Sequence, residues 1–330
     1  MLELRKLVFV SILLAIVVVS LGAYTRLTHA GLGCPDWPGC YGLIDVPESA
    51  AQIAKAEQAF PERPVEPEKA WNEMIHRYFA GSLGLLIALI TFISLKHRRQ
   101  GGPVILPLAI LGIVIFQAAL GMWTVTMKLM PIVVMGHLLG GFTTLVLLFL
   151  LYLRLKGYRL PTSDWSIKKF ANFALIGVFI LAGQIALGGW TSSNYAALTC
   201  TELPICQSGW VEQLDFKESF NPIPPKRDTY EFGHLNHNER VTIHVMHRIG
   251  AIVTTLYLAW LALMIFTKAQ TQFFRTSATV LAGILLVQVA LGISNIWFSL
   301  PLAVAVSHNV VAACLMMALV ALTYSLKRKI

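Results

Sequence analysis

The chain has 330 residues, of which 56% are hydrophobic and only 13% are charged, whereas soluble domains carry about 25% charged residues. This composition excludes an ordinary soluble domain and indicates an integral membrane protein. The formal net charge of +9 comes with a marked division of charge between two sets of loops. It is therefore explained by membrane topology and predicts no nucleic-acid partner.

Eight apolar segments are long enough to cross the hydrocarbon layer, which takes about 20 residues of helix. We therefore expect an all-α integral membrane protein with eight transmembrane helices. In chain order, the segments lie near residues 7–24, 76–95, 103–126, 132–153, 170–190, 243–266, 276–297 and 302–325.

The second half of the chain repeats the first. His76 and His137 recur as His247 and His308, both displaced by 171 positions, and the segment QAALG recurs as QVALG at the same displacement. Further upstream, LGAYTRLTHAGLGCPDWPGC lies without a gap over LGGWTSSNYAALTCTELPIC at a displacement of 166. Because each half has an even number of spans, both enter the membrane from the same side. We expect two tandem four-helix bundles, residues 1–160 and 161–330, related by a pseudo-twofold axis along the membrane normal.

The charged residues predict the orientation. Fifteen of the 17 carboxylates lie in residues 36–73 and 202–239, so we expect these two loops to be external. Cytoplasmic loops are rich in lysine and arginine, and we expect both termini on that side.

A signal peptide is the other interpretation of the first span, but its overlay on the fifth span favours a retained helix. The absence of a long basic presequence favours a bacterial inner membrane. The cations assigned to the cytoplasmic side are Arg5, Lys6, Lys96, Arg98, Arg99, Arg154, Lys156, Arg159, Lys168, Lys169, Lys268, Arg275, Lys327, Arg328 and Lys329.

The four repeated histidines are candidate metal ligands. A histidine in a membrane span is costly and usually marks function, although a hydrogen bond between helices also explains one. Repetition in register favours metal, and two imidazoles per bundle suit haem better than zinc, which prefers four ligands. Each half would hold one haem iron, between His76 and His137 and between His247 and His308. Because His76 and His247 open their spans, we expect both pairs toward the external leaflet.

The two external loops carry cysteine pairs, Cys34 with Cys40 and Cys200 with Cys206. Close pairs of this kind persist as disulfides in an oxidising compartment. A structural staple is one interpretation. A redox-active pair is the other, because tight loops that contain proline raise the potential of a disulfide.

The polar residues next to the histidines are repeated in one case and differ between the two halves in another. Arg77 and Arg248 follow His76 and His247, where a guanidinium either binds a haem propionate or extends to the lipid headgroups. Glu73 shares a helical face with His76, but 171 positions later the residue is His244. This asymmetry predicts a reactive haem site in the first half and a resident cofactor in the second. An acid that caps a helix start is the alternative.

Several segments resemble the haem A synthase family. They are GAYTRLTHAGLGCPDWPGC after the first span, EMIHR at 73–77, QAALG, the GH pair at 136–137 and IHVMHR at 243–248. The resemblance covers nearly the whole chain. It implies eight helices in two four-helix bundles, and an oxidoreductase that converts the C8 methyl of haem O to a formyl group. The family's reaction runs by successive hydroxylations and loss of water, and it supplies haem A to terminal oxidases.

The resemblance also implies roles for individual residues. His76 and His137 would ligate the substrate haem O, and His247 and His308 would hold haem b. Glu73 matches the family's essential glutamate, and Cys34 with Cys40 match its reactive disulfide. Some members of the family lack the cysteines, which weakens a redox role for Cys200 and Cys206.

The expected partners are the lipid bilayer, haem O, haem O synthase, the terminal oxidase assembly and an electron donor or acceptor of unspecified kind. Self-association into a homo-oligomer is left open. A transmembrane electron carrier of the cytochrome b561 type is the alternative function, but it would place haems near both membrane faces. A quinone-linked disulfide oxidase leaves the histidines unexplained, and a transporter would have broken helices at the bilayer midplane.

Overall fold

The computed structural model describes residues 2–157 and 162–328, and these residues form helices and loops without any strand. Arg159 and Lys329, two of the predicted cytoplasmic cations, and the predicted boundary between the halves at 160/161 lie outside the described residues. The elements in chain order are α1 (Leu2–Leu27), α2 (Ala50–Ala59), α3 (Pro67–Lys96), η1 (Arg98–Gln100), α4 (Ile105–Thr126), α5 (Pro131–Lys156), η2 (Thr162–Ile167), α6 (Phe170–Ser193), α7 (Phe216–Ser219), α8 (His237–Lys268), α9 (Gln272–Trp297) and α10 (Leu302–Lys327).

Eight helices among the described residues are long and apolar enough to cross a membrane. They confirm the expected all-α fold with eight spans, and the chain is a multi-pass membrane protein. Several helices begin before the predicted apolar segments, and the difference is largest for α3 and α8. His76 lies nine residues after Pro67, where α3 starts, and His247 lies ten residues after the start of α8 at His237. The expectation that these histidines open their helices is therefore wrong, because polar first turns precede both.

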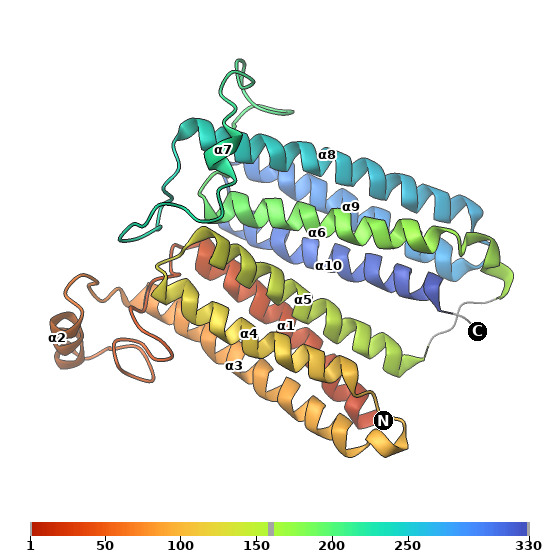
Figure 1. Ribbon diagram of the computed structural model, residues 1–330, viewed down its shortest axis with the longest axis horizontal. Coiled ribbons are helices and arrows are strands. Elements are labelled where there is room, and N and C mark those ends of the chain that lie inside the picture. Colours follow the sequence, from red (N-terminus) through yellow and green to blue (C-terminus); the bar gives the residue numbers. More distant parts are fainter. Residues whose placement is uncertain (1, 158–161, 329–330) are drawn as a thin grey trace.

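The helices of each half pack mainly with one another (Figure 1). Helices α1, α3, α4 and α5 lie together, and so do α6, α8, α9 and α10. The two groups meet where α1 and α5 contact α6 and α10. Both chain ends lie at one end of the helices, and the long loops that carry α2 and α7 lie at the other (Figure 1).

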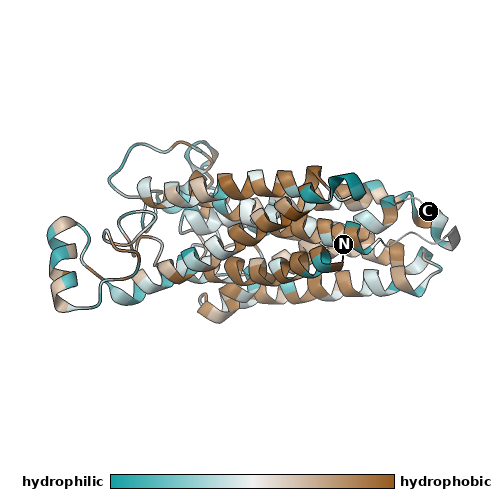
Figure 2. Ribbon diagram, turned by 90° about the horizontal axis from the view of Figure 1, so that it is seen from below, coloured by the Kyte–Doolittle hydropathy of each residue, from teal (hydrophilic) through white to brown (hydrophobic). Residues whose placement is uncertain are grey.

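Apolar side chains form both the interior and much of the outer surface. The largest buried cluster runs through both halves and includes Leu148 and Leu258, which are 0% exposed. Large hydrophobic residues such as Leu85, Phe92 and Leu286 face outward at 75%, 64% and 72% exposure. Figure 2 shows the apolar residues along the helices and the hydrophilic ones gathered in the end loops. An apolar exterior of this kind is suited to lipid rather than to water.

Contacts at the loop-bearing end join the two halves. Arg26 Nη2 on α1 donates to Ser192 O at 2.5 Å, and its guanidinium lies 4.0 Å from the centre of the Tyr195 ring. His29 stacks on Tyr195, with ring centroids 5.8 Å apart and an angle of 6° between the planes. Arg63 and Glu231 form a 2.8 Å ion pair between the two long loops.

A buried carboxylate joins the segment between the halves to the α8–α9 turn. Asp164 is 0% exposed and accepts the backbone N–H of Gln270 at 2.6 Å and that of Thr271 at 3.1 Å. It also accepts the Thr271 hydroxyl. An acid from another segment thus holds the two residues that precede α9.

Candidate functional site

The first histidine pair brings two rings together between α3 and α5. The ring centroids of His76 and His137 are 6.4 Å apart, and the rings are nearly perpendicular. Two imidazoles that bind one metal from opposite sides, with metal–nitrogen bonds of about 2 Å, have centroids roughly 6 Å apart. Both Nδ1 atoms are buried and have no hydrogen-bond partner. The pair therefore fits a bis-histidine iron site, in which the rings face the backbone of Val18 and Gln117.

A glycine on a neighbouring helix makes room for each of the four rings. A Cβ atom built on these glycines would lie between 3.0 and 3.4 Å from the Cε1 atom of the facing histidine. The glycines obey the same displacements as the repeat, 166 for one pair and 171 for the other. Their role was not predicted, although their recurrence in the repeat is a signal that sequence reasoning had available. The pairs are Gly22 with His76, Gly121 with His137, Gly188 with His247, and Gly292 with His308.

Side-chain amides of two glutamines lie next to the second histidine pair, on α8 and α10. His308 is close enough to His247 for the two rings to interact electrostatically. Gln184 Nε2 on α6 lies 3.0 Å from His247 Nδ1 and 3.0 Å from the His247 carbonyl. Gln288 Nε2 on α9 lies 3.3 Å from each ring nitrogen of His308. The two histidine pairs thus differ in their polar surroundings, a difference that sequence reasoning missed.

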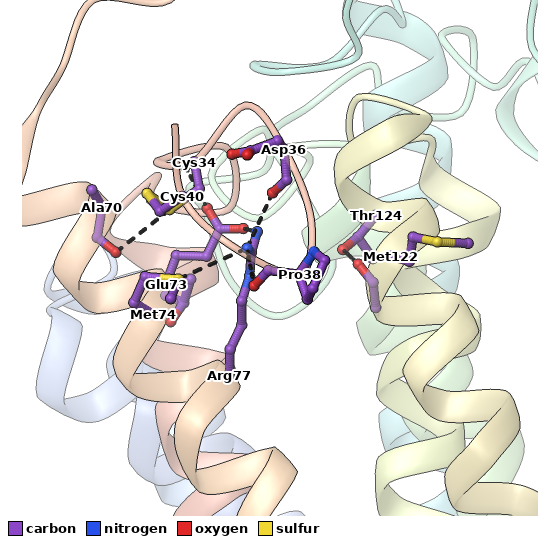
Figure 3. Close-up of polar contacts among 12 residues, drawn as sticks. Cys34, Asp36, Pro38, Cys40, Ala70, Glu73, Met74, Arg77, Met122 and Thr124 are labelled. Carbon is purple, nitrogen blue, oxygen red and sulfur yellow. Dashed lines mark hydrogen bonds and ion pairs between the residues drawn. A yellow bond between two sulfur atoms is a disulfide. The ribbon is translucent and has the colours of Figure 1, made fainter. Parts of the chain in front are cut away.

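Glu73 is bound to the first cysteine loop (Figure 3). It is 5% exposed, and its Oε2 accepts the backbone N–H of Cys34 at 2.9 Å. Its Oε1 forms an ion pair with Arg77, one turn further along α3. Both carboxylate oxygens are therefore engaged, which satisfies a charge that would be costly to bury alone. The predicted helical face shared with His76 places the acid one turn from the ring.

Arg77 holds the same loop by its backbone carbonyls. Its Nη1 donates to Gly39 O at 2.5 Å, to Asp36 O at 3.1 Å and to Pro38 O at 3.3 Å. A guanidinium has five donors in a fixed fork, so one side chain serves three carbonyls and the carboxylate of Glu73. In the structure, the guanidinium is thus directed toward the cysteine loop (Figure 3).

The second half contains the same arrangement with one substitution. Arg248 Nη2 donates to Cys200 O at 2.5 Å, and its Nη1 donates to Glu202 O at 2.5 Å and to Ile205 O at 2.7 Å. His244 stands where Glu73 stands in the first half, and its Nδ1 accepts the N–H of Cys200 at 3.1 Å. An imidazole thus replaces the carboxylate, and the ion pair of Glu73 with Arg77 is replaced by a contact of Arg248 Nε with His244 Nε2 at 3.3 Å.

Both cysteine pairs are joined as disulfides, each with a Cα–Cα distance of 4.8 Å. Cys34 and Cys40 are both 0% exposed. The first disulfide is thus covered by its own loop and by the N-terminal part of α3. Reagents from solution reach it only when the loop opens.

Among the residues that the structure describes, no three His, Cys, Asp or Glu side chains gather as a metal site. The candidate ligands therefore occur as two pairs of imidazoles. Two imidazoles fill two of the six coordination positions of an iron ion. The four nitrogen atoms of a porphyrin fill the other four. The residues fit haem better than a bare metal ion.

Comparison with known proteins supports this interpretation. The model of the COX15-CtaA family, described as a cytochrome oxidase assembly protein, matches residues 5–320. The chain belongs to the COX15-CtaA family. It is 51% identical over 327 residues to a heme A synthase of Shewanella oneidensis, covering 99% of this chain and 98% of that protein. More distant COX15-CtaA relatives include heme A synthases of Brucella ovis and Brucella suis, each 25% identical over 317 residues, with 91% of this chain and 84% of each relative covered. The expected family is thus confirmed.

Proposed function

We propose that this protein is a haem A synthase, an oxidoreductase that converts the C8 methyl group of haem O to a formyl group. The observation that carries the proposal is the 51% identity to a heme A synthase along 99% of the chain. The pairing of His76 with His137 at 6.4 Å between ring centroids gives the chain a site for a haem iron. The product, haem A, would serve the assembly of terminal oxidases.

We assign the substrate to the first half, residues 1–160, with His76 and His137 as ligands of haem O. The second half, residues 161–330, would hold haem b between His247 and His308 and supply redox chemistry. The presence of Glu73 in the first half and of His244 in the equivalent position supports this division. The apolar exterior suits a substrate with a farnesyl tail, which would enter from the lipid.

We infer that the halves are tandem four-helix bundles related by a pseudo-twofold axis along the membrane normal. Support comes from Arg26 with Ser192 and His29 with Tyr195, two contacting pairs whose members are each 166 positions apart. Residues on an axis of this kind meet their own equivalents. Both termini would be cytoplasmic and both cysteine loops external, in the inner membrane of a bacterium.

The residues around Cys34 have separate tasks in this proposal. Glu73 would accept a proton or orient the C8 methyl group, while its contact with Arg77 keeps the carboxyl group in place. Arg77 and Arg248 would hold the cysteine loops over the haem edges, where a remaining donor is able to bind a propionate. Cys34 and Cys40 would carry redox equivalents, and Cys200 with Cys206 would staple the second loop. The electron partner and haem O synthase are the expected partners.

Expression in a host that makes haem O but no haem A tests the proposal. Extracted haems are separated by chromatography and identified by mass. Haem A or its hydroxylated precursor is the expected product. Bound haem b with unchanged haem O would instead favour a bis-histidine electron carrier. The variant in which all four ligand histidines are alanine controls for background haem oxidation.

A further inference from the structure

The four ligand candidates differ in whether a side-chain amide reaches them. In the second half, Gln184 lies 3.0 Å from His247 Nδ1 and Gln288 lies 3.3 Å from the nitrogens of His308. In the first half, no side-chain amide reaches His76 or His137, and their rings face the backbone of Val18 and Gln117. In both halves, a glycine on a neighbouring helix faces each ring.

The difference at His247 has a local cause in the sequence. At the repeat displacement of 166, Gln184 corresponds to Val18, which has no polar group. The amide of Gln184 also needs space on α8, because a Cβ built on Gly250 would lie 2.3 Å from its Oε1. At the displacement of 171, Gly250 corresponds to Phe79. The first half thus lacks both the amide and the space for it.

The difference at His308 has another cause, because its glutamine exists in both halves. Gln117 corresponds to Gln288, but Gln117 lies against Gly140, where a built Cβ would be 1.4 Å from its Nε2. In the second half, Val311 corresponds to Gly140. Its side chain fills the space that the amide of Gln117 occupies in the first half, so Gln288 does not adopt the same direction. Gln288 is directed to His308 instead. One side chain in α10 thus determines where the amide points.

A partner of this kind matters for a ligating histidine. The ring nitrogen that does not bind metal usually donates to a fixed acceptor, which orients the ring and makes it a stronger ligand. An amide has an oxygen and a nitrogen that exchange places by rotation about its last bond. In the structure the Nε2 atoms of Gln184 and Gln288 face the rings, and their Oε1 atoms are buried and unpartnered. Rotation of each amide presents its oxygen to the ring as an acceptor, and in Gln184 this oxygen replaces the donor to the His247 carbonyl.

We propose that Gln184 and Gln288 are positioning residues that make His247 and His308 a permanent haem pair, and that their absence beside His76 and His137 lets the first half release its haem. This inference deepens the proposed function and rests on it. A substrate must leave after reaction, whereas a cofactor must stay. The two halves would achieve these opposite requirements with the same ligands and different partners for the ligands.

The test compares the haem b content and midpoint potential of purified variants. Gln184→Val installs the first-half residue and Gln288→Leu removes the second amide. Each is expected to weaken haem b binding roughly 10- to 100-fold and to raise the potential of the haem that remains, because a less basic ligand favours the ferric state less. Gln184→Glu keeps an acceptor oxygen and is expected to keep haem b. Gln117→Leu is the matched control and is expected to change neither quantity.

The reciprocal variant Gly140→Val fills the space that Gln117 occupies and is expected to slow release of haem from the first half. Unchanged haem b content and potential in both Gln184→Val and Gln288→Leu would overturn the inference, even with haem A still produced. Loss of haem b from these variants in a chain that never makes haem A would overturn the synthase function and leave the positioning role in place.

Discussion

The backbone N–H of Cys34 donates to the carboxylate of Glu73 at 2.9 Å. An acid one turn from a candidate iron ligand is therefore bound to a disulfide loop. Because the same carboxylate pairs with Arg77, movement of the loop, of α3 or of the arginine changes the surroundings of the acid. The loop and the histidine pair form one connected site.

Glu73→Gln keeps the shape of the side chain and removes its charge. We expect haem content to stay at the wild-type level and haem A output to fall about 100-fold or more, as for loss of a proton-transferring group. Haem extraction and chromatography measure both quantities. Glu62→Gln, on the exposed part of the same loop, is the control. Wild-type haem A output from Glu73→Gln would refute a chemical role for the acid.

His247→Ala is expected to strip haem b from the purified protein, because one of its two ligands is lost. The reduced-minus-oxidised absorbance spectrum of the detergent-solubilised protein measures the loss. His97→Ala, at the other end of α3, is expected to keep the full spectrum. A complete haem b spectrum in the His247 variant would move the resident site elsewhere.

Gly22→Val adds a side chain where the ring of His76 packs, since even a Cβ would lie 3.0 Å from its Cε1. We expect the ring to be displaced and haem O binding to fall about tenfold or more. Gly81→Val is the matched control, because nothing lies within 4 Å of a Cβ built there. Titration of the solubilised variants with haem O measures the affinities, and equal values for the two would contradict a spacing role for Gly22.

Arg77→Met removes the donors that hold the first cysteine loop. A hydrogen bond to a charged group contributes about 1.5–3 kcal/mol, so we expect the loop to open more than tenfold more often. Faster reduction of Cys34–Cys40 by dithiothreitol, followed by labelling of the thiols, reports the opening. Arg98→Met, at the opposite end of the helices, is expected to react at the wild-type rate. An unchanged rate for Arg77→Met would show that other contacts keep the loop closed.

The stability of the same loop should depend on pH through Tyr41. Its hydroxyl donates to Pro64 O at 3.0 Å, and burial raises the pKa of Tyr41 to about 12. The neutral phenol is the form that folding favours, so its stabilisation is complete below the ordinary pKa of 10.0 and is lost as the pH rises through about 12. Tyrosinate absorbance, wild type minus Tyr41→Phe, should show this late titration. A difference centred near the ordinary value would contradict it.

The apolar pattern was sufficient to predict the eight helices, because length and hydropathy alone determine which segments cross a membrane. It misplaced the starts of α3 and α8, since the first turns of both are polar. The capping box of Asn236 and Glu239 was a local signal for one of them. Contacts of Arg77 with carbonyls 38 to 41 positions away have no such signal, because they depend on how the loop folds back. The directions of Gln117 and Gln288 likewise depend on a neighbouring helix.

The contacts between Arg26 and Ser192 and between His29 and Tyr195 bear on the origin of the molecule. An ancestor with four helices, assembled as a homodimer, would have placed identical residues opposite each other at both positions. An arginine would then have faced an arginine, and the two like charges would repel. Joining two copies in one gene would allow each position to change alone, so that the contact between the halves acquires a donor from Arg26 and an acceptor from Ser192. Under the proposed function, the same freedom would have allowed the two histidine pairs to specialise.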